Sequence, residues 1–90
     1  MRLAKSEHLI LTLLAARGGC YGLELVQASR GRLKRGGIYV TLGRMEDKGL
    51  VTSASNTEDG RRRYRPTALG ERALVAARVF AGQITIGAKA

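Results

Sequence analysis

The sequence predicts a mainly α-helical domain with one small β-hairpin, and three observations support this class. Apolar residues recur at helical spacing in four segments of the chain. Between the third and fourth segments the pattern changes to strand-forming residues around an Asp-Gly turn. The length of 90 residues leaves room for a single core. We therefore expect the order helix, helix, helix, hairpin, helix.

The first two helices are short and separated by glycines. Ser6 is the candidate N-cap of the first, which ends near Arg17 at a double glycine. Its apolar side chains follow helical spacing: Leu9, Ile10, Leu13 and Leu14. A second helix is expected over residues 22–29. Residues 30–37 are rich in glycine and basic side chains, which is typical of a turn.

The third helix is predicted over residues 37–48 and has two distinct faces. The inward face carries Ile38, Leu42 and Met45. The opposite side carries Val40, Gly43 and Arg44, flanked by Tyr39 and Thr41. Gly43 would allow a close approach to a partner, and free backbone amides at residues 36–38 would donate hydrogen bonds to a phosphate oxygen.

A hairpin follows, with arms at residues 50–55 and 61–65 joined by a polar loop. Pro66 closes the second arm because proline cannot donate to a strand ladder. Strand alternation places Tyr64 inward, in the core, and Arg61, Arg63 and Arg65 outward.

The fourth helix begins at Thr67, a candidate N-cap, and extends to about Gly82; residues 84–90 receive no assignment. One face carries Leu69, Ala73, Ala76 and Phe80. Val75 and Val79 lie on another side. A small domain covers only one such face, so we predict a dimer contact through Val75, Val79 and Phe80. The alternative is that single aliphatic side chains are simply exposed.

Net charge indicates the class of partner. The chain carries +9, and ten of its 16 basic residues lie between positions 30 and 65. A polyanion is the natural partner, either nucleic acid or an anionic membrane, and clustering on a turn and a hairpin favours nucleic acid. The apolar run at residues 9–16 is too short to span a bilayer, which takes about 20 residues.

Other chemistry is not expected. Cys20 is the single cysteine, His8 is the single histidine, and the glycine pair at residues 36–37 lacks the lysine and hydroxyl of a phosphate-binding loop. We expect no enzyme, no cofactor and no metal site, and a reducing, cytoplasmic setting in association with the nucleoid. A small-molecule effector is left open.

Three helices followed by a basic hairpin form a winged helix-turn-helix, in which the third helix enters the major groove of DNA. We expect residues 1–66 to form this DNA-binding domain and residues 67–90 to form a C-terminal dimerisation region. The candidate DNA contacts are small, polar or basic: Lys34, Arg35, Gly37, Tyr39, Val40, Thr41, Arg44, Arg61, Arg62 and Arg63.

The motifs resemble the PadR family of bacterial transcriptional regulators. The second helix opens with Tyr21-Gly22 followed by Leu25, and the third runs from Gly37 through Arg44 to Gly49-Leu50. The features that follow are Arg63-Tyr64, Thr67 and Gly70. The hairpin departs from the family in reading Arg-Tyr-Arg where many members have two tyrosines, and the C-terminal region is short, which fits the small members.

The resemblance implies a homodimer that binds a palindromic operator, usually as a repressor, through Tyr39, Arg44 and a wing at residues 61–63. The function expected from the sequence is therefore a sequence-specific, double-stranded-DNA-binding regulator. The alternative is a winged-helix module that is architectural, or that binds protein or RNA, without reading sequence.

Overall fold

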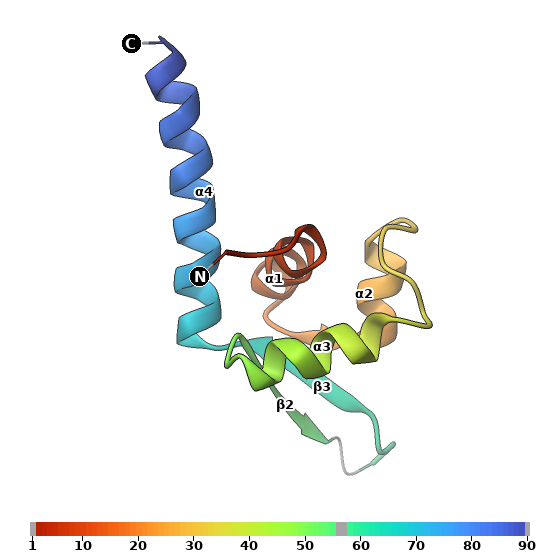
Figure 1. Ribbon diagram of the computed structural model, residues 1–90. Coiled ribbons are helices and arrows are strands. Elements are labelled where there is room, and N and C mark those ends of the chain that lie inside the picture. Colours follow the sequence, from red (N-terminus) through yellow and green to blue (C-terminus); the bar gives the residue numbers. More distant parts are fainter. Residues whose placement is uncertain (1, 56–57, 90) are drawn as a thin grey trace.

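The fold is that of a computed structural model, which describes residues 2–55 and 58–89, with side chains described through Val79. Figure 1 shows the elements in order along the chain. They are α1 (Lys5–Arg17), β1 (Cys20–Tyr21), α2 (Gly22–Ala28), α3 (Ile38–Asp47), β2 (Val51–Ser55), β3 (Arg62–Pro66) and α4 (Ala68–Lys89). The predicted order of helices and hairpin is confirmed.

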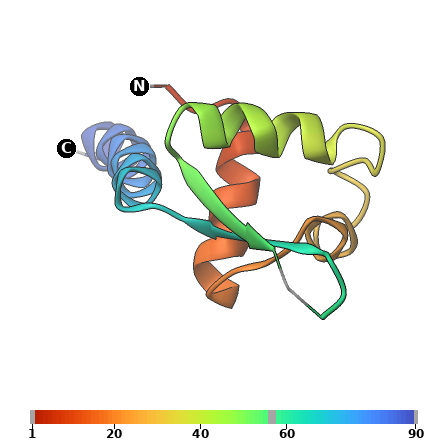
Figure 2. The same cartoon turned by 90° about the horizontal axis from the view of Figure 1, so that it is seen from below.

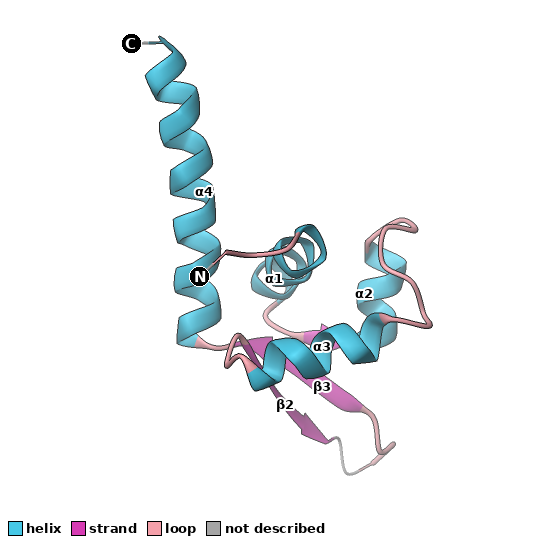
Figure 3. Cartoon of the chain, in the orientation of Figure 1, coloured by secondary structure: helices cyan, strands magenta, loops and turns pink. Residues whose placement is uncertain are grey.

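The strands form one antiparallel sheet in the order β1-β3-β2, so β3 is central. Tyr64 on β3 lies opposite Cys20 on one side and Ser53 on the other. Figure 3 shows the sheet beneath the helices. The sequence did not predict β1, because two residues cannot display strand alternation. Pro66 ends the hairpin as expected, although it still lies within β3, opposite Val51.

The core lies between α1, α3 and the sheet. All its members are 0–6% exposed: Ile10, Leu11, Leu14, Cys20, Leu25, Leu33, Ile38, Leu42, Met45, Leu50, Val51, Tyr64 and Leu74. Burial of each large aliphatic side chain contributes about 1.5–3 kcal/mol. The predicted inner face of α3 and the inward position of Tyr64 are both confirmed.

Helix α1 begins earlier than Ser6. The N-cap is Ala4, whose amide donates to Glu7 Oε1 at 2.9 Å, and Ser6 lies exposed in the first turn. The Glu7 side chain thus takes over the capping role that the sequence suggested for a hydroxyl. Gly18 ends the helix in a left-handed conformation at φ 70°, as expected.

Helix α4 is joined to the domain at Thr67 and Gly70. The Thr67 hydroxyl donates to the Gly49 carbonyl and accepts from the Gly70 amide, which confirms Thr67 as the cap. A Cβ at Gly70 would lie 2.0 Å from the Leu50 carbonyl oxygen. Only glycine allows α4 to approach the α3–β2 connection this closely.

That close approach sets which face of α4 points inward. Leu74 is 3% exposed and Gly70 is buried, whereas Leu69 is 38% exposed and Ala76 is exposed. The predicted inner face is therefore wrong at Leu69 and Ala76, whereas Ala73 packs against the core as expected. Helix α4 also continues to Lys89, through the segment the sequence left unassigned.

Substituting Gly70 by alanine should lower the free energy of unfolding by about 2 kcal/mol, because the added methyl collides with a backbone carbonyl. Gly43→Ala is the matched control: a Cβ there meets nothing within 4 Å. The higher helix propensity of alanine should raise the free energy of unfolding of this variant by about 1 kcal/mol. Urea unfolding at a fixed protein concentration measures both, and equal effects would contradict the α4 contact.

An ion pair joins the start of α1 to the end of α3. The Lys48 ammonium donates to Glu7 Oε2 at 2.7 Å, and the Glu7 side chain is only 7% exposed. Burial raises the pKa of Glu7, but the hydrogen bonds from Lys48 and the Ala4 amide outweigh it, so the pKa lies below the usual 4.5.

Because the folded pKa is lowered, this carboxylate stabilises the fold above about pH 4.5, and the contribution is lost as pH falls through the folded pKa. Lys48→Met should lower the free energy of unfolding by about 1 kcal/mol at pH 7, a modest value since Lys48 is half in water. The deficit should shrink at pH 3. Lys5→Met, on the exposed side of α1, is the control; a deficit independent of pH would argue against the pair.

Candidate nucleic-acid interface

The outer face of α3 combines exposed apolar and basic side chains. Tyr39 is 50% exposed and Val40 57% exposed, and Arg44 is exposed on the same side of the helix. Exposed apolar side chains beside a cation are what a major-groove surface needs, since they contact thymine methyl groups while the guanidinium meets guanine or phosphate.

Tyr39 is held by a close contact with the start of α2. A Cβ at Gly22 would lie 2.7 Å from Tyr39 Cε1, so the absence of a side chain at Gly22 makes room for the ring. The Tyr-Gly pair of the second helix therefore positions a residue of the third. The sequence contained both residues but no sign that they touch.

The amides at the start of α3 are already occupied. The Gly37 and Ile38 amides both donate to the Lys34 carbonyl, at 3.1 and 3.0 Å. The expectation that amides of residues 36–38 are free to bind a phosphate is therefore wrong for these two. The Thr41 hydroxyl also donates internally, to the Gly37 carbonyl at 3.1 Å.

The basic loop between α2 and α3 is anchored at its centre. Leu33 is 5% exposed, and its amide donates to Ser29 Oγ at 2.9 Å. Ser29 is itself buried and donates to the Val26 carbonyl. Because Leu33 and Ser29 are buried, the basic side chains of the loop lie at the surface: Arg30, Arg32, Lys34 and Arg35.

The hairpin connects to α3 through a chain of side-chain hydrogen bonds. Arg62 Nη1 donates to Ser53 Oγ at 3.0 Å, and Ser53 Oγ donates to Glu46 Oε2 at 2.8 Å. Glu46 belongs to α3, so the helix and the wing hold each other in place. Nothing in the sequence indicated Glu46 or Ser53, because their contact depends on the packing of α3 against β2.

Arg61 lies at the turn of the wing, just before β3, and contacts two other side chains. Its guanidinium carbon is 3.9 Å from the centre of the Tyr21 ring. Its Nε donates to Asp59 Oδ2 at 3.0 Å. The hydrogen bond from the Arg61 amide lowers the pKa of Asp59, so this partner is a carboxylate near neutral pH.

These parts lie on one side of the molecule. Viewed from below, the hairpin lies in front of α1, with α3 and its preceding loop alongside, while α4 stands apart at the edge (Figure 2). The elements that carry the predicted contacts, α3, the loop and the wing, are thus neighbours, and the predicted contact residues are exposed or half-buried.

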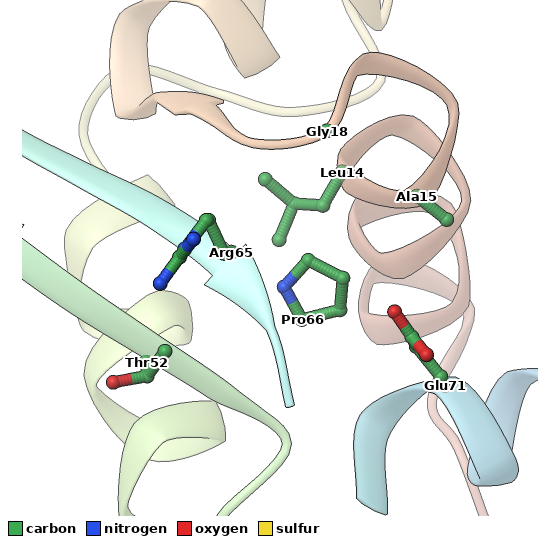
Figure 4. A pocket seen from close by; sticks show the side chains of 7 residues that line it. All are labelled: Leu14, Ala15, Gly18, Thr52, Arg65, Pro66 and Glu71. Carbon is green, nitrogen blue, oxygen red and sulfur yellow. The ribbon is translucent and has the colours of Figure 1, made fainter. Parts of the chain in front are cut away.

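Further features of the described residues lie outside this interface. A hollow of about 220 Å³ lies between the end of α1, the hairpin and the start of α4, with Arg65 and Glu71 among its lining side chains (Figure 4). Burial raises the pKa of the Cys20 thiol, which keeps it neutral and unreactive. Among the described residues, no acidic, His or Cys cluster could hold a metal. No helix there is long and apolar enough to cross a membrane.

Comparison with solved structures supports this geometry. A PadR family transcription regulator from hypervirulent Clostridium difficile is 29% identical with a TM-score of 0.74, covering 93% of this chain and 97% of its own. A mutant MarR from Escherichia coli, complexed with operator DNA, is 18% identical with a TM-score of 0.80, covering 90% of this chain and 57% of its own. YusO from Bacillus subtilis is 23% identical with a TM-score of 0.77, covering 97% of this chain.

The chain spans about three fifths of the length of the last two proteins, at 57% and 60%, so those similarities show the winged-helix fold alone. No curated protein matches significantly. The model of the transcriptional regulator PadR-like family matches residues 10–76, most of the chain. The protein therefore belongs to the PadR-like family of transcriptional regulators, which are DNA-binding proteins and not enzymes.

Proposed function

We propose that the protein is a sequence-specific regulator that binds a palindromic operator as a homodimer and represses transcription, acting at the nucleoid in the cytoplasm. The observation that carries this proposal is the outer face of α3, where Tyr39, Val40 and Arg44 are exposed next to the basic loop and the wing. The MarR structure with operator DNA supports it, because that protein shares the fold.

In this proposal α3 reads bases and the cations around it bind phosphates. Lys34 and Arg35 flank the start of the helix, and Arg62 and Arg63 lie on the wing. Each phosphate neutralised contributes about −0.9 to the slope of log affinity against log salt. Arg44 is the residue best placed on the outer face to reach a guanine edge or a phosphate.

The dimer contact is proposed on α4, within residues 67–90. Val75 is 55% and Val79 51% exposed, and they line an open apolar groove of about 580 Å³ with Ala68, Glu71, Arg72 and Ala76. Figure 1 shows α4 continuing well beyond the rest of the domain. A second copy of the same helix is the proposed occupant, because a two-fold axis gives each apolar face an identical partner. Phe80 is included by its sequence position, its side chain lying outside the described residues.

Arg44→Ala should weaken binding to the operator by about 1–3 kcal/mol while changing binding to random duplex much less. Arg78→Ala removes one exposed arginine from α4 and should change neither. Fluorescence anisotropy at several salt concentrations, with the protein's own promoter region and a scrambled duplex, measures both. Equal affinity of the wild type for the two duplexes would favour the architectural alternative.

The double substitution Val75→Asp and Val79→Asp should convert the dimer to a monomer, since a pair of carboxylates cannot be buried against their own copies. Sedimentation velocity at micromolar concentration measures the change, with far-ultraviolet circular dichroism to confirm that helices remain. Val40→Asp, at an equally exposed valine on α3, should stay dimeric. A dimeric double mutant would place the contact elsewhere.

A further inference from the structure

The three consecutive arginines of the wing have different surroundings. Arg62 is bonded to Ser53, as described above, and Arg63 lies with its guanidinium carbon 5.9 Å from the centre of the Tyr21 ring. Arg61 is held most closely, because the same ring is 3.9 Å away and Asp59 accepts from both its Nε and its amide at 3.0 Å. From the sequence alone, all three arginines are predicted as equivalent DNA contacts.

The charge around Arg61 is unsuited to a phosphate. Asp59 neutralises the guanidinium at hydrogen-bond distance, and Glu58 adds a second carboxylate to the same turn. A phosphate brought to Arg61 would compete with the Asp59 carboxylate for the guanidinium, whereas Arg63 lies farther along β3.

The contact of Arg61 with Tyr21 adds a further link between β1 and the wing. The β1–β3 pairing ends at Tyr21 opposite Arg63, so Arg61 lies two residues beyond the last paired position. Stacking on the Tyr21 ring links the part of the wing beyond the β1–β3 pairing to β1. The Tyr21 amide in turn donates to Glu24 at 2.8 Å at the start of α2.

Tyr21 is also the neighbour of Gly22, the residue that makes room for Tyr39 of α3. One dipeptide thus touches the wing on one side and the DNA-facing helix on the other. We propose that Arg61 is a positioning residue: stacked on Tyr21 and paired with Asp59, it fixes the wing relative to α3 and leaves the phosphate contacts of the wing to Arg62 and Arg63. This inference rests on the proposed DNA-binding function.

Four single variants and one double variant test the assignment by operator affinity and its salt dependence. Arg63→Ala should reduce the magnitude of the salt slope by about 0.9 per protomer. Arg61→Ala and Tyr21→Leu should each weaken binding about two- to fivefold without changing the slope. The double variant should be no weaker than either single variant. Tyr21→Phe keeps the ring on which Arg61 stacks and should weaken binding less than Tyr21→Leu.

A slope change for Arg61→Ala equal to that of Arg63→Ala would overturn the proposal, as would losses that multiply in the double variant. Backbone ¹⁵N relaxation of residues 58–61 in the free protein gives a test independent of DNA. Those amides should gain motion in Arg61→Ala and Tyr21→Leu, and gain less in Tyr21→Phe, which keeps the ring; unchanged relaxation in the first two variants would also overturn the proposal. If the wild type bound no duplex while relaxation behaved as expected, the DNA-binding proposal would be wrong. The role of the Arg61–Tyr21 contact in positioning the wing would still be supported.

Discussion

The antiparallel pairing of β3 with both of its neighbours is the interaction on which the rest of the structure depends. Tyr64, at 6% exposed, lies between Cys20 and Ser53 and brings its ring into the core. This pairing fixes the wing to the body through β1 and to α3 through β2. Without it, the basic strand would be a charged segment with no defined direction relative to the helix it accompanies.

Internal contacts decide which charges remain available to a partner. Glu7 forms an ion pair with Lys48 at the C-terminal end of α3, and Asp59 forms one with Arg61 at the wing turn. A hydrogen bond to Ser53 also occupies one guanidinium nitrogen of Arg62. The count of 16 basic residues therefore overstates the number of independent phosphate contacts, since a cation paired with a carboxylate contributes little to the outer field.

Helix α4 shows where sequence pattern and tertiary contact disagree. Its cap, Thr67, was predictable because a hydroxyl before a helical pattern is a local signal. Its inner face was not, because leucine and alanine positions allow more than one apolar stripe. The contact of Gly70 with the Leu50 carbonyl selects the stripe that contains Leu74 and turns Val75 outward.

The sequence by itself determined the order of elements, the buried face of α3, the core position of Tyr64 and the family, because these follow from periodicity and from motifs local in the chain. Only the tertiary structure decided the strand at Cys20, the occupied amides of Gly37 and Ile38, and the unequal surroundings of the wing arginines. Each of these depends on groups brought together from separate segments. No local pattern records that Arg61 will meet Tyr21, since 40 residues of chain separate them.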